Sequence, residues 1–155
     1  MYILYNKYID AKSLYMKLTS PEFNHNQSIP KRFSCDGDNV SPELHIHDVP
    51  DEAESLVLIV DDHDVPAQVK WDCYFDHWVV FNIPADTNKI GEGESVGTVG
   101  ANSQGNSSYT GPCPPTKYHP IQHHYNFRLL ALNSQLGLQE GATKEEFLAA
   151  AKGSV

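Results

Sequence analysis

The stretch SLVLIVDDHDVP at residues 55–66 decides the fold class. Its first part, Ser55–Asp62, is a run of aliphatic and β-branched residues that ends in two acids, which predicts a buried central strand. Two more runs have the same character: HWVVFNIP at His77–Pro84, which its own proline ends, and YNFRLLALN at Tyr125–Asn133. In the last run, alternate residues share a face, as they do in a strand. The sequence therefore predicts a mainly β protein.

A short helix is predicted near the C-terminus. Thr143 is placed to cap its first turn, and Glu146, three residues later, completes a capping box. Phe147 begins a short apolar face, and Gly153 is expected to end the helix. Two weaker strands are expected near Tyr15–Leu18 and Leu44–His47.

Size and charge limit what the chain does. Its 155 residues fit one domain, which we place at residues 16–155, with residues 1–15 as an N-terminal extension. The 11 Lys and Arg against 20 Asp and Glu give a net charge of −9, and no basic stripe could neutralise a nucleic-acid backbone. No window approaches the ~18 apolar residues of a membrane span. We therefore expect neither nucleic-acid binding nor a spanning segment.

The three cysteines suggest a compartment. Cys35, Cys73 and Cys113 leave at least one thiol unpaired and form no C-x-x-C pair. A disulfide scaffold and a cysteine-based zinc site are therefore not expected, and a small buried thiol is the simplest interpretation of Cys113. On this reasoning the protein is placed in the cytoplasm.

A long stretch rich in glycine and proline, Ala85–Gln122, separates the second and third predicted strands. Unstructured loops longer than ~12–15 residues are uncommon unless they are functional, so we expect the chemistry to lie here. Gly91-x-Gly93 is followed by Val96 where a dinucleotide fingerprint requires glycine, and no P-loop pattern occurs. Asp36-Gly37-Asp38 lacks the rest of a calcium loop. We expect neither a cofactor nor a metal.

Polar groups gather at the ends of the three predicted strands. Asp62 and Asp64 close the first strand two residues apart, so both carboxylates fall on one side while the strand persists. His77 opens the second strand, and His123 with Tyr125 opens the third on one face. If these strands are neighbours, the groups converge at one edge of the sheet, facing the glycine- and proline-rich loop. Each residue alone is ordinary at a strand end, but the set predicts a binding site.

The residues that carry these features resemble the phosphatidylethanolamine-binding protein family, also called Raf-kinase-inhibitor-like proteins, and its bacterial branch most of all. The resemblance runs from about Met16 to Lys152. It implies a large antiparallel β-sheet packed on a smaller one, with Greek-key connections and a C-terminal helix. The sequence blocks that carry it are MKLTSPEF, IPKRFSCDGDNVSPEL, SLVLIVDDHDVP, HWVVFNIP, GPCPP, HHYNF and the T-x-E-E-F start of the helix.

The resemblance also implies a pocket for phosphate or a phospholipid headgroup at one end of the sheet. Carried over by position, its residues are Asp62, Asp64 and Pro66 after the first strand, His77, the wall Tyr109, Gly111, Pro112 and Pro114, and finally His123 and Tyr125. The seven residues Thr116–Gln122 form a longer connection than the family pattern suggests, so His119 is an alternative to His123. No catalytic residue is assigned.

Three functions remain open at this stage. The first is non-enzymatic binding of a small anion through loop amides, the Tyr125 hydroxyl and imidazole groups, with Asp62 and Asp64 orienting His77 and His123. The second is a hydrolase that uses the same acids and histidines, with or without a metal. The third is a regulatory protein that binds a kinase or protease through the pocket rim, with self-association as a homodimer also considered.

Overall fold

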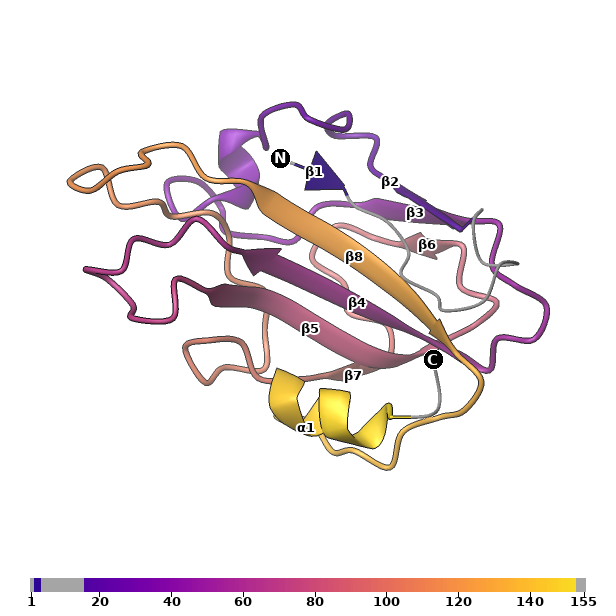
Figure 1. Ribbon diagram of the computed structural model, residues 1–155. Helices are drawn as coiled ribbons and strands as arrows, with labels where there is room; N and C mark the ends of the chain where they lie inside the picture. The colour runs from indigo at the N-terminus through magenta and orange to yellow at the C-terminus, as the bar shows by residue number, and fades with distance from the viewer. Residues whose placement is uncertain (1, 4–15, 153–155) are drawn as a thin grey trace.

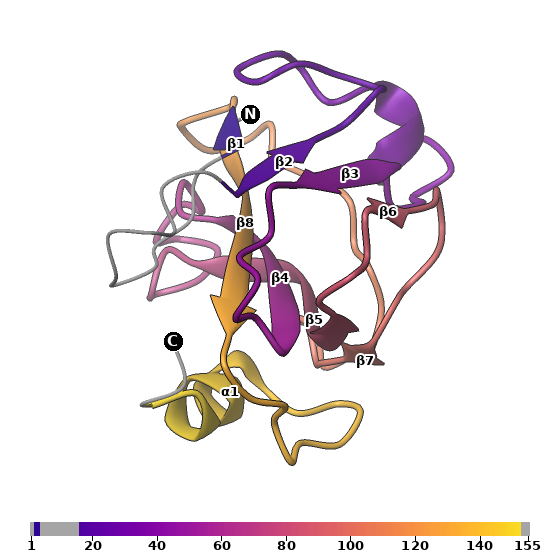
Figure 2. The same ribbon diagram turned by 90° about the vertical axis from the view of Figure 1, so that its right-hand side faces the viewer.

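Two β-sheets and one helix lie in three layers, with the large sheet between the small sheet and the helix (Figure 1; Figure 2). The computed structural model describes residues 2–3 and 16–152. Its elements are β1 (Tyr2–Ile3), β2 (Lys17–Thr19), the 3₁₀ turn η1 (Lys31–Phe33), β3 (Leu44–His47), β4 (Ser55–Asp62), β5 (Phe75–Pro84), β6 (Lys89–Ile90), β7 (Thr98–Val99), β8 (Tyr125–Leu132) and α1 (Lys144–Ala150).

The predicted mainly β fold with two sheets and a C-terminal helix is confirmed. The large sheet has the order β1-β8-β4-β5-β7 and the small sheet β2-β3-β6. All pairings are antiparallel except that β1 runs parallel to β8. β3 and β4 have the predicted bounds, whereas β5 begins two residues before His77. Apart from β1, the proposed extension at residues 1–15 lies outside the described residues.

Strand β4 has a buried side chain at every position because both of its faces are covered. Leu56, Leu58 and Val60 belong to the core between the two sheets. Val57 and Ile59 belong to a second core against α1, where Phe147 is fully buried. Since successive strand residues point to opposite faces, Asp61 and Asp62 continue these two cores into two separate polar sites.

Strand β5 contains one extra residue opposite the end of β4. Val60 pairs with Trp78 and Asp61 pairs with Asp76, so His77 is the additional residue at this shift of register. Such β-bulges re-aim side chains and are common beside functional sites. Here the bulge places Asp76 opposite Asp61.

The helix begins as predicted. The Thr143 hydroxyl accepts a hydrogen bond from the Glu146 amide, and the Glu146 carboxylate accepts one from the Thr143 amide, which completes the capping box. Phe147 then enters the core below the large sheet. Gly153, predicted to end the helix, lies outside the described residues.

The expectation about the cysteines is wrong. Cys35 and Cys113 form a disulfide across 78 positions of sequence, and Cys73 is the free thiol. Both bonded cysteines are exposed. Pairing over this distance leaves no local pattern in the sequence, because it depends on the packing of η1 against the segment before β8. The argument that placed the chain in the cytoplasm therefore loses its basis.

No helix within residues 2–3 and 16–152 has both the length and the apolar character needed to traverse a lipid bilayer.

Candidate functional site

The ends of β4, β5 and β8 lie side by side at the left-hand end of the molecule in Figure 1. There the Asp62 carboxylate lies 2.6 Å from His123 Nδ1, and both side chains are buried. The second ring nitrogen of His123 lies 3.0 Å from the Pro120 carbonyl oxygen. Both ring nitrogens of His123 therefore have an acceptor within hydrogen-bond distance, and these two contacts fix the orientation of the ring. His119 is exposed, so the structure places His123, and not His119, on Asp62.

His77 is oriented by the backbone of the proline-rich loop. Its Nδ1 lies 2.6 Å from the Thr110 carbonyl oxygen and therefore donates to it. The ring meets Tyr125 edge to face at 5.1 Å between centroids and contacts Phe75 at 4.6 Å. Burial lowers the pKa of His77, against the opposing effects of the Thr110 carbonyl and the Asp62 charge. His77 is therefore neutral at pH 7.

Two buried donors in this region have no hydrogen-bond partner among the described residues: the Tyr125 hydroxyl and the Trp78 indole N–H. The Tyr125 ring lies between His77 and His123, stacked on the latter at 6.4 Å between centroids. Burial and then the Asp62 charge raise the pKa of Tyr125, so its hydroxyl keeps its proton. Because burying an unpaired hydroxyl costs about 1–3 kcal/mol, these atoms point to a function other than stability.

The predicted wall Tyr109–Pro115 rests on the segment after η1. The Tyr109 hydroxyl donates to the Phe33 carbonyl oxygen at 2.8 Å, and the Gly111 amide donates to Asn39 Oδ1 at 2.8 Å. A Cβ added at Gly111 would lie 2.1 Å from the Phe33 oxygen, so only glycine permits this approach. Pro112 accepts a hydrogen bond from the Cys35 amide. The loop amides of Thr110 and Gly111, expected to serve an anion, are used within the protein.

The remaining predicted residues lie at the edge of this group. Asp64 accepts hydrogen bonds from the His124 amide and ring, at 2.8 and 2.7 Å, rather than orienting His77. These bonds lower the pKa of Asp64, although burial opposes them. Pro66 is buried and its carbonyl accepts a hydrogen bond from the Val69 amide, which forms a turn. Pro114 is half-buried in the wall.

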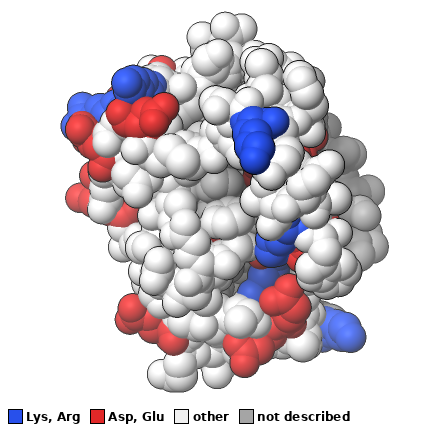
Figure 3. Space-filling view, turned by 90° about the vertical axis from the view of Figure 1, so that its left-hand side faces the viewer, with Lys and Arg blue, Asp and Glu red and all other residues white. Residues whose placement is uncertain are grey.

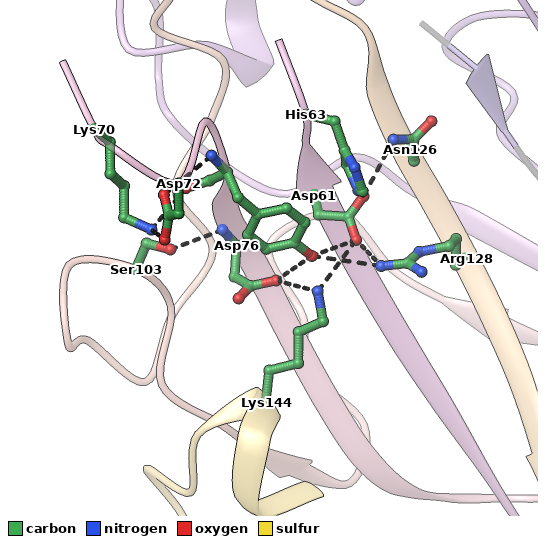
Figure 4. Close-up of polar contacts among 10 residues, drawn as sticks. Asp61, His63, Lys70, Asp72, Asp76, Ser103, Asn126, Arg128 and Lys144 are labelled. Atoms are coloured by element: carbon green, nitrogen blue, oxygen red, sulfur yellow. Dashed lines mark hydrogen bonds and ion pairs between the residues drawn. The ribbon is translucent and has the colours of Figure 1, made fainter. Parts of the chain in front are cut away.

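A second polar cluster occupies the opposite face of the same strand ends, beside α1 (Figure 4). Asp61 is fully buried. It accepts a hydrogen bond from the Tyr74 hydroxyl at 2.7 Å and forms an ion pair with Arg128. Lys144, from the first turn of α1, lies 3.2 Å from Asp76 and 3.6 Å from Asp61, with its ammonium above the Tyr74 ring. Two further side chains, His63 and Asn126, bind the other oxygen of Asp61. We call this group the helix-side cluster.

Burial dominates the charges of the helix-side cluster. It raises the pKa of Asp76 to about 7, with Glu145 adding to the shift. It also lowers the pKa of Lys144 to about 8. Both groups are thus driven toward their neutral forms by the loss of water.

Sequence reasoning missed several of these residues. The orienting carbonyls of Thr110 and Pro120 cannot be read from side-chain type. Asp61 carried a usable signal, because a residue adjacent to Asp62 in a strand must face the opposite side of the sheet. Its partner Tyr74 comes from the loop before β5 and its partner Lys144 from a helix near the end of the chain, so their meeting depends on the fold.

The site has no dense positive charge. Figure 3 views the end of the molecule from which the loops after β4 and before β8 project; most atoms there are neither acidic nor basic, and the surface is hollowed near the middle. Within the described residues, no group of three or more His, Cys, Asp or Glu side chains could hold a metal ion. The groups that gather here are imidazoles, a phenol, an indole and the two carboxylates of Asp62 and Asp64.

Comparisons with known proteins agree with this architecture. The family model for phosphatidylethanolamine-binding protein matches residues 19–155. The chain is 43% identical over 141 residues to a UPF0098 protein of Chlamydia trachomatis (90% of this chain and 91% of that one), and 44% identical over 147 residues to one of Methanothermobacter thermautotrophicus, with the same coverage.

Two solved structures are also similar. The crystal structure of a phosphatidylethanolamine-binding protein homologue from Chlamydia trachomatis matches with a TM-score of 0.84 and 42% identity, over 90% of this chain and 89% of that one. YbcL of Escherichia coli, at 24% identity and a TM-score of 0.77 over 90% of each chain, shares the fold. The chain therefore belongs to the phosphatidylethanolamine-binding protein family.

Proposed function

We propose that this protein binds, without turning it over, a small phosphate-bearing anion such as a phospholipid headgroup, held between His77, Tyr125 and the wall Tyr109–Pro115. The observation that carries the proposal is the Tyr125 hydroxyl, a buried donor with no partner among the described residues, set between two histidines. An anionic oxygen is the acceptor such a donor lacks, and charge-assisted hydrogen bonds of this kind are about twice as strong as neutral ones.

The two acids beside the proposed pocket already have partners within the protein. The Asp62 carboxylate is hydrogen-bonded to His123. Asp64 is likewise engaged by His124. The donors left for a ligand are the Tyr125 hydroxyl, the Trp78 indole N–H and, once the ring is charged, the second nitrogen of His77. A phosphate group offers enough oxygens to meet all three.

Binding is expected to take up a proton. Because Nδ1 of His77 donates to Thr110, its Nε2 can donate to an anion only when the ring is charged. The pKa of His77 lies below its usual 6.5 in the free protein, and a bound anion raises it. Affinity should therefore rise by up to about tenfold for each unit of pH decrease between these two pKa values, and level off below the lower one.

Titration calorimetry with inorganic phosphate between pH 5 and 8 tests the proposal. We expect tighter binding at lower pH, together with proton uptake that is visible as a dependence of the binding heat on buffer. The variant His77→Gln should bind more weakly and lose the pH dependence. An affinity that is flat or rises with pH would overturn the proposal. Release of phosphate from generic phosphoester substrates, lost in His77→Gln, would instead favour a hydrolase.

A regulatory partner such as a kinase or protease would use the rim rather than these buried groups. Trp71, 88% exposed in the loop after β4, and Ile121, 57% exposed in the loop before β8, are the rim residues suited to such a contact. Trp71→Ala should then weaken partner binding while leaving the affinity for phosphate unchanged.

A further inference from the structure

The wall of the proposed pocket is tied to the rest of the molecule by a covalent bond at the surface. Cys113 lies within the wall Tyr109–Pro115, and Cys35 follows η1. Both cysteines are exposed, so a thiol from solution can reach the bond. Buried structural disulfides lack this access. The position of the bond therefore calls for an explanation beyond chain stability.

The same wall carries the backbone that orients His77. Thr110, three residues before Cys113, accepts from His77 Nδ1 at 2.6 Å, and its amide donates to the His77 carbonyl at 2.9 Å. The fixed point on the other side is the segment after η1, which binds the wall through the disulfide and through the Cys35 amide to Pro112 at 3.1 Å. Only the backbone from Thr110 to Cys113 thus separates the disulfide from the carbonyl group that orients the His77 ring.

We propose that Cys35–Cys113 is a thiol–disulfide exchange site whose reduction loosens the wall and weakens anion binding at His77 and Tyr125. The proposal rests on the binding function proposed above. The co-reactant is a dithiol reductant: one of its thiolates attacks a sulfur of the bond and releases one cysteine as a thiolate, and the reductant's second thiol then attacks the resulting mixed disulfide and releases the other cysteine. The protein gains two electrons and two protons and ends with two cysteine thiols, while the reductant becomes a disulfide.

Reduction should loosen the wall without unfolding the protein. The hydrogen bonds from Tyr109 to Phe33 and from Gly111 to Asn39 do not involve sulfur, so they keep the wall attached to the rest of the molecule while the loss of the disulfide lets it shift. The two hydrophobic cores lie in and between the sheets and against α1, and neither contains Cys35 or Cys113. What is lost is preorganisation of one pocket wall, which is expected to weaken affinity by about 3- to 10-fold.

The test compares phosphate affinity, measured by titration calorimetry, for the oxidised chain and for the chain reduced with dithiothreitol and then freed of reductant without air. Alkylation followed by mass measurement should count one thiol before reduction, Cys73, and three after it. Reduced protein should bind about 3- to 10-fold more weakly, and reoxidation should restore the affinity. Far-UV circular dichroism checks that the sheets remain.

Two variants provide controls. The double variant Cys35→Ser, Cys113→Ser should bind phosphate with the affinity of the reduced chain, and dithiothreitol should not change that affinity. Cys73→Ser, which leaves the bond intact, should respond as the natural chain does. Equal affinity of the oxidised and reduced chains, with the thiol count changed, would overturn the inference.

A separate readout distinguishes failure of this inference from failure of the binding function. The imidazole proton signals of His77 in NMR spectra, recorded without any ligand, should shift on reduction because the Thr110 contact changes. If the oxidised chain binds no phosphate but these signals shift, the binding function is wrong and the coupling stands. If the signals do not move on reduction, the coupling is wrong whatever the chain binds.

Discussion

Tyr125 combines two properties that usually exclude each other: it is 6% exposed, and its hydroxyl has no partner among the described residues. A residue kept for packing alone would serve better as phenylalanine. Tyr125→Phe should therefore leave the free energy of unfolding unchanged or raise it by up to about 1 kcal/mol, because an unsatisfied buried group is removed. Phosphate affinity should fall about 5- to 20-fold with the loss of a charge-assisted hydrogen bond.

Tyr109 is the matched control for this change. Its hydroxyl is already bonded to the Phe33 carbonyl, and burial raises its pKa as it does for Tyr125. Tyr109→Phe should lower the free energy of unfolding by about 1 kcal/mol, measured by urea denaturation, with a smaller effect on affinity. If both variants lost stability and neither lost affinity, Tyr125 would have no special role.

At the scale of elements, the ends of β4, β5 and β8 each carry one residue for each face of the sheet. Asp62 and Tyr125 face the core between the sheets, whereas Asp61 faces α1. On β5, the bulge at His77 places Asp76 opposite Asp61, so that Asp76 also lies beside α1. The helix-side cluster and the proposed pocket are therefore built on the same strand ends, one on each face of the large sheet.

Lys144 is the point at which α1 joins this cluster. Lys144→Met keeps the aliphatic stem but removes the ammonium, which leaves Asp61 and Asp76 without one of their cations. The free energy of unfolding should fall by about 2–4 kcal/mol near neutral pH, as for other pairs broken in a buried setting. Lys152→Met, which removes the charge of an exposed lysine after the same helix, should have little effect.

The loss caused by Lys144→Met should grow as the pH rises above about 8. The pKa of Lys144 is lowered from 10.5 to about 8 on folding, so between these values the unfolded chain binds one proton more than the folded chain, and the natural chain gains stability that the variant cannot gain. Asp76, whose pKa burial raises to about 7, lacks this neighbouring cation in the variant when it ionises. Urea denaturation of both chains at pH 5.5, 7.5 and 9.5 measures this. Equal losses at all three would contradict it. The other charged groups that face the pair are Asp61, Arg128, His63, Lys70, Asp72 and Glu145.

The sequence predicts what depends on short-range pattern and misses what depends on distant contacts. The apolar run Ser55–Asp62 and the capping box at Thr143 were readable because propensity and spacing act locally. The Cys35–Cys113 bond joins segments 78 positions apart, and Lys144 meets Asp61 from another layer of the fold. The bulge at His77 also has no pattern of its own, since it exists only in the pairing of two strands.

The whole molecule carries a net charge of −9, and this charge opposes an anionic ligand during its approach. The repulsion grows with the ligand's own negative charge and is screened by salt, with a Debye length of about 30 Å at 0.01 M and about 8 Å at 0.15 M. Lowering the salt concentration should therefore weaken binding of inorganic phosphate more than binding of zwitterionic phosphoethanolamine.

Parallel titrations of the two ligands at about 0.01 M and 0.15 M salt measure this difference. Phosphoethanolamine keeps a positive ammonium and serves as the less charged comparison with the same phosphate group. Tighter binding of phosphate at low salt would mean that a local positive field, rather than neutral donors, dominates the site.

Asp61 and Asp62 are joined by one peptide bond, yet one serves the helix and the other a histidine on the far side of the sheet. A heritable change in either acid disturbs the setting of its neighbour, so the two faces cannot evolve independently. Among descendants of this chain, replacement of Asp61 should arise together with replacement of Lys144 or Arg128. Sequences in which Asp62 is replaced should also have His123 replaced.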